Sequence, residues 1–413
     1  MRNTSLKIIQ ILFLFLCIAV TSLKAQNSAL LDAKIDVVYL ASDYLEGREA
    51  GSRGERLAAE YIAKRFRDIG LTTIGDNGSW FHEFPFQFKS NPHAAEGEAR
   101  TGVNVVGYLD NRAANTVVIG AHFDHLGWGS SSSLFAEGKA IHNGADDNAS
   151  GVAALIRIAA NLKSNKKAAH NNYLFIAFSG EELGLFGSKY FVEHPPVDLA
   201  KVNYMLNMDM VGRLNEEKVL AVNGAGTSPA WKPALEKLSV DGIQVKTTDS
   251  GIGPSDHTSF YLQDLPVLHF FTGQHADYHK PSDDAALINF DGLISVTDLI
   301  IALIEQLDGS GKIAFTKTKD EDENRKATSF KVTLGVMPDY VFSGEGMRVD
   351  GIIGGRPAEK AGMLKGDIII KIGEIEVKDI YTYMDGLGKF NPGDKAKVTF
   401  KRGDEVMEKE VQF

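Results

Sequence analysis

The chain has 413 residues, which is too long for one ordinary hydrophobic core and suits two or three domains. Hydrophobic residues make up 44% of the sequence and charged residues 24%, proportions typical of a globular protein. The formal net charge of −10 argues against nucleic acid or an anionic membrane surface as the main partner.

The first 25 residues have the layout of a secretory signal peptide. Arg2 and Lys7 give it a positive start, an apolar run follows at 8–20, and Ala25 offers a cleavage site. The run is short for a membrane span, so we expect export to the periplasm or the cell exterior, with no stable span after cleavage. An uncleaved anchor is the alternative. The only cysteine, Cys17, lies in this segment, so any metal must be held by His and carboxylates.

After this segment, the sequence predicts helices first and then alternating strands and helices. Residues 29–71 predict two helices around a turn rich in Gly and Arg. Four short apolar runs follow, separated by helical stretches such as 150–164. Nearly continuous apolar strands predict an α/β domain whose mixed, mostly parallel sheet is sandwiched by helices.

Each of the four apolar runs ends in residues that can carry chemistry. The first run reaches His122, the second Glu181 and the third Asp209. The fourth reaches His275 and His279. Because ligands bind at the carboxyl ends of the strands in such sheets, we expect these side chains to meet at one edge.

The pattern changes near Asp308. The next residues are polar and charged with little apolar periodicity, as in a linker, and short strand-like runs with one helix signal then predict a small β-rich domain. We therefore divide the chain into a signal peptide at 1–25, an α/β domain at 26–309, a linker at 310–330 and a β-rich domain at 331–413.

Glu181 and Glu182 stand side by side between glycines, directly after the second apolar run. Two ionised neighbouring carboxylates repel each other, and a cation between them removes the repulsion. Other candidate ligands are histidines and carboxylates without thiolates, a set that suits zinc in a catalytic site. These further candidates are His122, Asp124, Asp146, Asp147, Asp209 and His279.

Two metal ions could share such a set of ligands. One bridging carboxylate plus two residues per ion makes a two-metal site with ions about 3.5–4 Å apart, and the surplus acid can act as a base. Each feature alone has a simpler explanation. A lone histidine after a strand is more often structural, as we expect for His269, and an Asp pair before a helix is more often an N-cap.

Six motifs, taken in order, resemble the secreted di-zinc aminopeptidases of metallopeptidase family 28. The motifs are "GAHFDH", "NGADDNASG", "FSGEELGLFGS", "NMDMVGR", "PSDHTSF" and "DYHKPSDD", and the resemblance covers residues 32–307. The family also contains glutamate carboxypeptidase II-like enzymes and glutaminyl cyclases. The resemblance therefore implies the zinc exopeptidase fold.

The resemblance also implies a role for each ligand position. His122 and Asp209 would bind one zinc ion, and Glu182 and His279 would bind the other. Asp147, the second acid of "ADDN", would bridge the two ions, giving two Zn2+ per chain.

Further residues match catalytic or supporting positions of the family. Glu181 matches the general base, and Asp124 matches the acid that orients His122. Asp256 and His257 match residues that line the site, and the peptide bond after Asp147 is often cis in this family. Some relatives place an oxyanion-stabilising tyrosine shortly before "SDH"; the segment here, "SGIGPSDH", has none, so that role is open.

The C-terminal segment resembles a PDZ domain. The carboxylate-binding loop would comprise Thr333, Leu334, Gly335 and Val336. Backbone N–H groups of such a loop can hold a peptide C-terminus while a strand pairs with the peptide. The alternative is a docking module that binds no free peptide.

We therefore expect a zinc-dependent exopeptidase, most simply an aminopeptidase that acts on peptides with Glu181 as general base. Alternatives are a carboxypeptidase, another zinc hydrolase of the same fold, or an inactive PDZ-bearing peptide-binding protein. An inactive protein would be expected to lack a ligand, and every ligand position is present in the sequence.

Overall fold

The computed structural model describes residues 28–88, 97–129, 132–135, 137–318, 332–338, 342, 344–352, 355–378, 380–403 and 405–413. The predicted signal peptide and most of the predicted linker lie outside these ranges. Within the described residues, no helix is both long enough and apolar enough to cross a membrane.

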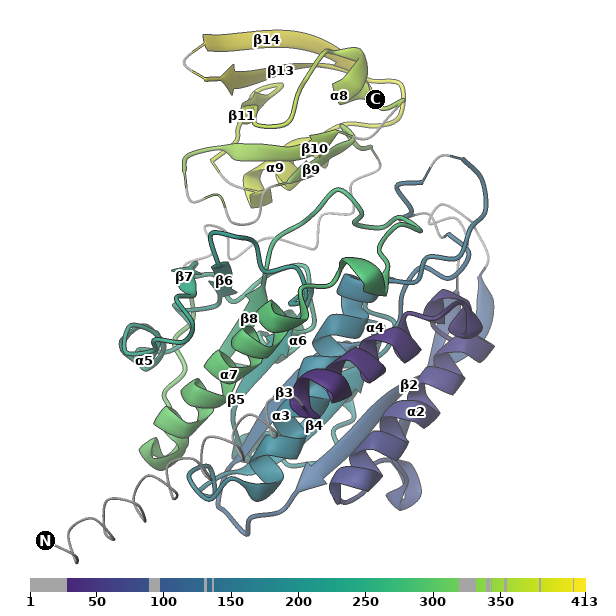
Figure 1. The fold of residues 1–413 in the computed structure, drawn as a ribbon. Coiled ribbons are helices and arrows are strands. Elements are labelled where there is room, and N and C mark those ends of the chain that lie inside the picture. Colours follow the sequence, from purple (N-terminus) through teal and green to yellow (C-terminus); the bar gives the residue numbers. More distant parts are fainter. Residues whose placement is uncertain are drawn as a thin grey trace, which may run out of the picture.

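The larger part of the chain is built on one mixed eight-stranded sheet, as the sequence predicts (Figure 1). Its strand order is β1-β2-β4-β3-β5-β8-β6-β7, and the central strands β4, β3, β5 and β8 are parallel. The strands are β1 (Phe81–Phe88), β2 (Glu98–Leu109), β3 (Thr116–His122), β4 (Asn172–Phe178), β5 (Val202–Met208), β6 (Val219–Asn223), β7 (Gln244–Thr247) and β8 (Val267–Phe271).

The central strands are buried along their whole length. All seven residues of β3, of β4 and of β5 are buried, which explains why their sequences read as unbroken apolar runs. Helices cover both faces of the sheet (Figure 1). One face carries α2 (Arg53–Ile69), α3 (Gly151–Ser164) and α7 (Phe290–Leu307), and the other carries α4 (Phe186–Glu193) and α6 (His257–Tyr261), while the short α5 (Trp231–Leu235) contacts α7.

Local signals set the ends of the long helices. Ser52 caps α2 by accepting a hydrogen bond from the Glu55 N–H, and Gly70 ends that helix in the left-handed conformation with φ 86°. Asn289 caps α7 by accepting from the Gly292 N–H. The Glu55 carboxylate, fully enclosed, also accepts from the Val103 N–H and the Ser179 hydroxyl, so α2 is fastened to β2 and to the turn after β4.

A second, antiparallel sheet forms the C-terminal part and has its own hydrophobic core. Its strand order is β14-β13-β11-β10-β9, with β12 beside β11. The elements are β9 (Val336–Pro338), β10 (Met347–Ile352), α8 (Pro357–Lys360), β11 (Ile368–Ile372), β12 (Ile375–Glu376), α9 (Ile380–Leu387), β13 (Lys395–Arg402) and β14 (Glu405–Gln412). The β-rich fold predicted for this part is confirmed.

The described start of the predicted linker packs against the large domain. Ile313 is 7% exposed and belongs to the main core cluster, and Phe315 packs on the cluster at the opposite face of the sheet. The Thr316 N–H donates to the carbonyl of Thr227, and the Thr318 N–H donates to the Tyr261 hydroxyl. Residues 311–318 therefore contribute to the stability of the large domain.

Replacing Ile313 by Ala is expected to destabilise the large domain by about 2–4 kcal/mol, because a buried side chain is lost and a cavity remains. All three tryptophans, Trp80, Trp128 and Trp231, precede residue 309, so fluorescence-detected unfolding of the full chain reports on this domain. Thr316→Ala changes an exposed side chain of the same segment and is the control. Equal unfolding midpoints for the two variants would show that the segment is a linker.

Candidate metal centre

The predicted ligands lie where the parallel strands end. His122 is the last residue of β3, and Asp209 follows β5 directly. Glu181 and Glu182 follow β4, and His279 lies in the connection after β8. Asp147 lies in a π-helical turn, Ala145–Ser150, that leads into α3. One edge of the sheet thus gathers residues that are up to 157 positions apart, from His122 to His279.

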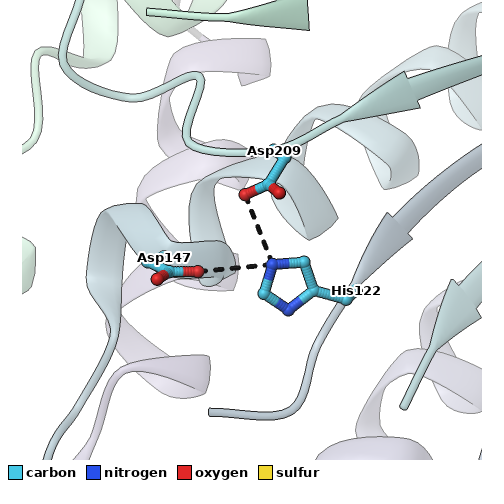
Figure 2. A group of neighbouring side chains, drawn as sticks. All are labelled: His122, Asp147 and Asp209. Carbon is cyan, nitrogen blue, oxygen red and sulfur yellow. Dashed lines mark hydrogen bonds and ion pairs between the residues drawn. The ribbon is translucent and has the colours of Figure 1, made fainter. Parts of the chain in front are cut away.

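Two groups of donor atoms share the carboxylate of Asp147. The Nε2 atom of His122 is 3.3 Å from Oδ1 of Asp147 and 3.3 Å from Oδ1 of Asp209 (Figure 2). The Nε2 atom of His279 is 3.3 Å from Oδ2 of Asp147 and 3.3 Å from Oε2 of Glu182. The two oxygens of Asp147 therefore face different groups.

These separations fit zinc coordination. Donor atoms bound tetrahedrally at 2.0–2.1 Å from one zinc ion lie about 3.3 Å from each other. All four separations, two at each imidazole, have this value. The donors are nitrogen and oxygen, which zinc accepts in catalytic sites, and Asp147 is placed to bridge two ions.

Hydrogen bonds at the far side of each ring fix the imidazoles. The Nδ1 atom of His122 is 3.2 Å from the backbone oxygen of Asp124, and Nδ1 of His279 is 2.9 Å from the backbone oxygen of Ser132. A carbonyl can only accept, so Nδ1 carries the proton in both rings. The lone pair of Nε2 is then free to bind a metal.

Without metal ions, the buried acids and imidazoles shift one another's pKa values. Burial lowers the pKa of His279, but the Glu182 and Asp147 carboxylates outweigh it and hold the pKa well above its usual range. Burial raises the pKa of Glu182, but His279 and His125 bring it down to about 2. Burial, with the Asp209 and Glu182 charges, holds the pKa of Glu181 well above its usual range. Protonated imidazoles thus supply the positive charge beside the acids that a bound metal ion would otherwise supply.

Asp124 contacts both the His122 ring and the backbone of Glu181. Its Oδ1 atom is 3.7 Å from Nδ1 of His122, while its backbone oxygen makes the closer contact with that ring. The same Oδ1 atom accepts a hydrogen bond from the Glu181 N–H at 3.2 Å. The side chain predicted to orient His122 is therefore also an anchor for the backbone of Glu181.

The first acid of the Asp pair has a structural role. Asp146 is enclosed and accepts from the Gly212 N–H at 2.7 Å, with His275 Nε2 at 3.2 Å from its other oxygen. The Asp283 carboxylate accepts from the N–H groups of both Asp146 and Asp147. His275, at the end of the fourth apolar run, thus pairs with Asp146.

The neighbouring residue Asn148 ties the turn that carries Asp147 to the end of β5. The peptide bond between Asp147 and Asn148 is cis, as the resemblance predicts. The Asn148 amide donates to the Met208 carbonyl at 3.0 Å and accepts from the Met210 N–H at 3.1 Å. Both flanks of Asp209 are therefore held to the Asp147 turn.

Asp256 and His257 lie behind the wall of the central cavity. Both are fully buried at the start of α6. His257 stacks on His269 with ring centres 4.6 Å apart, and His269 lines the cavity. Burial raises the pKa of Asp256 to about 7.

A cavity opens at the ligand groups. Its lining includes the five predicted metal ligands and Glu181. Met210, Pro254 and Phe271 contribute apolar surface to it, and Asn223, His269, Gln274 and Tyr278 contribute polar groups.

Sequence reasoning missed His125. Its Nδ1 atom is 2.8 Å from Oε1 of Glu182, the oxygen that does not face His279, and 3.8 Å from Asp147. A separation of 2.8 Å is a hydrogen bond and is shorter than the 3.3 Å between donors of the two groups. His125 therefore orients Glu182. The last letter of "GAHFDH" was the available signal.

Sequence reasoning also missed Arg48, whose guanidinium is 1% exposed. It donates to the carbonyls of Phe123 and Asn143 at 2.6 and 2.7 Å, and to those of Gly144 and Leu40. It thereby joins the loop after His122 to the turn before Asp147. Burial lowers the pKa of Arg48 to about 10, while Asp124 and Asp147 act in the opposite direction, so the cation persists at neutral pH beside the acids.

Two family models match the chain. The model described as Peptidase family M28 matches residues 104–304, and the PDZ domain model matches residues 313–413. Arg48 and the helix that follows it therefore lie before the matched peptidase segment.

The chain is similar to curated aminopeptidases over part of their length. Aminopeptidase YwaD of Bacillus subtilis is 30% identical over 175 residues, which cover 39% of this chain and 37% of the relative. Leupeptin-inactivating enzyme 1 of Streptomyces exfoliatus is 29% identical over 240 residues, which cover 58% of this chain and 47% of the relative. The chain thus spans less than half the length of these two relatives.

Solved structures confirm the fold of the large domain. A zinc aminopeptidase from Bacillus subtilis, named BSAP, superposes with a TM-score of 0.54 at 19% identity, covering 69% of this chain and 98% of that one. Porphyromonas gingivalis glutaminyl cyclase gives a TM-score of 0.52 at 18% identity, covering 67% and 98%. At these identities the likeness concerns the fold alone.

Replacing His125 by Asn is expected to weaken zinc binding by about 10–100-fold, because partners that orient a metal ligand contribute on this scale. Competition between the purified protein and a chromophoric chelator measures the affinity. His170→Asn is the control, since the His170 side chain is 76% exposed and pairs with Asp308, away from the site. Unchanged zinc affinity in the His125 variant would contradict the conclusion that His125 orients the ligand Glu182.

Proposed function

Since the chain carries a peptidase family M28 domain followed by a PDZ domain, we propose that it is a di-zinc aminopeptidase that removes N-terminal residues from peptides. The observation that carries the proposal is the pair of imidazole–carboxylate groups sharing Asp147, with all four donor separations at 3.3 Å. His122 and Asp209 would hold one ion, and Glu182 and His279 the other. Ions bound there would supply Lewis acidity to a carbonyl oxygen and to water.

Glu181 is the residue best placed to move the proton. It lines the cavity but belongs to neither ligand group, and Asp124 fixes its backbone through the Glu181 N–H. In the proposed reaction its carboxylate takes a proton from the attacking water and gives it to the leaving amine.

The lining of the cavity favours an amino terminus over a carboxyl terminus. Two bound divalent ions would balance the charges of Asp147, Glu181, Glu182 and Asp209, and among the described residues no Arg or Lys lines the cavity. The cavity therefore offers no side-chain cation that could hold a substrate carboxylate. This supports an aminopeptidase rather than a carboxypeptidase. Convergence of every ligand position argues against an inactive peptide-binding protein.

For the C-terminal domain we propose capture of a peptide C-terminus. β9 lies at the edge of its sheet, so its outer side is placed to pair with an added strand. Gly335 has φ 78°, and a Cβ there would lie 2.1 Å from Cβ of Arg356, so the loop needs glycine at this position. Arg356 therefore packs its Cβ and Cγ atoms against the loop predicted to bind a carboxylate.

We further propose that the protein is exported. The layout of residues 1–25 supports export, although those residues lie outside the described ranges. A mature chain starting at residue 26 would contain no cysteine, which suits an oxidising compartment without a disulfide requirement.

Purified mature protein is expected to bind about two zinc ions per chain and to hydrolyse aminoacyl reporters. A chelator should remove the activity and zinc should restore it. N-acetylated reporters should be resistant, because their amide carries no positive charge. Cleavage of blocked peptides that end in a free carboxylate would instead identify a carboxypeptidase, and zero zinc by elemental analysis would overturn the mechanism.

Substitutions of the two neighbouring glutamates are expected to have different effects. Glu181→Gln should lower kcat by about 100-fold or more while zinc stays bound, because it removes the base and no ligand. Glu182→Gln should lower zinc affinity as well. Measuring zinc content and kcat on the same samples separates the two effects, and equal loss of zinc in both variants would show that the roles are wrongly divided.

A further inference from the structure

His269, expected from the sequence to be a core histidine, lies on the wall of the active-site cavity. It belongs to β8 and is 4% exposed, and its ring lines the same cavity as His122 and Asp209. Its nearest ring neighbour, His257, lies almost parallel to it at 13°. The backbone of β8 and the stacking contact with the buried His257 ring thus hold the His269 ring in place.

A chain of hydrogen bonds sets which ring nitrogen carries the proton. The Thr248 hydroxyl donates to Oδ1 of Asn223 at 2.7 Å, which leaves the amide nitrogen of Asn223 facing Nδ1 of His269 at 3.3 Å. Nδ1 must then accept, so the proton of the neutral ring is on Nε2. Burial lowers the pKa of His269 to about 4, which agrees with a neutral ring.

The donor at Nε2 has no partner among the described residues. The atom is buried and makes no hydrogen bond there. Leaving a buried N–H unpaired costs about 1–3 kcal/mol, so the unpaired donor of a ring that lines the cavity favours an acceptor in a bound molecule.

We propose that Nε2 of His269 donates a hydrogen bond to the carbonyl oxygen of the scissile bond and holds that oxygen as it gains negative charge. This inference rests on the proposed peptidase function. The four cavity acids suit the substrate's N–H groups, whereas a carbonyl oxygen needs a donor.

Three variants of the full mature chain separate the donor from the bulk of the ring. His269→Phe keeps an aromatic ring for the stack but removes the donor, and kcat should fall on the order of 10²-fold with zinc content unchanged. His269→Gln restores an N–H at a similar reach and should recover part of kcat. His194→Phe, at an exposed histidine, is the matched control.

Two readouts do not depend on turnover. Nitrogen-15 NMR of the zinc-loaded protein should show His269 as the neutral Nε2–H tautomer, and Asn223→Ala should disturb it. An aminoalkyl boronic acid, which forms a tetrahedral anion, should lose affinity in His269→Phe by a larger factor than the free amino acid does.

The outcomes distinguish this inference from the function on which it rests. An inactive parent protein would overturn both. An active parent with unchanged kcat in His269→Phe, or an Nδ1–H tautomer, would overturn the role of His269 alone. Loss of zinc from His269→Phe would also overturn it, since His269 would then position the ligand Asp209.

Discussion

Crowded, buried carboxylates need positive charge, and this requirement governs the architecture of the large domain. Asp147, Glu182 and Asp209 approach two imidazoles at the bottom of a cavity where their side chains are largely buried, with Glu181 beside them. Ionised acids in such a space repel each other and lose hydration, so they stay together only with cations. Two divalent ions satisfy that condition, and the separations of 3.3 Å match them.

The fold supplies the rigidity that this arrangement requires. Parallel strands buried along their length deliver His122, Asp209 and the Glu pair to one edge. Loops between them are fixed by buried polar groups, since Arg48 binds carbonyls on two loops and Asp283 binds the N–H groups of the Asp147 turn. A fixed cation such as Arg48 offsets part of the negative charge without competing for the metal positions.

The histidines near the site differ in which ring nitrogen contacts a neighbouring residue. His122 and His279 donate through Nδ1 to backbone oxygens and direct Nε2 to the acids. His125 contacts Glu182 through Nδ1, and the amide of Asn223 faces Nδ1 of His269. One residue type is therefore placed to serve as ligand, as orienting group and as donor to the cavity, according to which nitrogen its neighbours occupy.

The sequence alone determined the fold class and which side chains meet at one edge of the sheet, because both leave local traces. Unbroken apolar runs mark buried strands, and polar residues at their ends mark the edge where functional side chains gather. Tertiary structure decided the partners. His125, Arg48 and Asp283 resemble surface or turn residues in the sequence, since their roles depend on contacts with segments that are 57, 75 and 136 positions away. The burial expected for His269 is present, but the sequence could not show that this residue also lines a cavity, because an apolar run does not reveal which of its side chains meets one. Residues 311–318 looked like a linker because their few apolar side chains show no periodicity, and only the folded domain offers Ile313 a buried place.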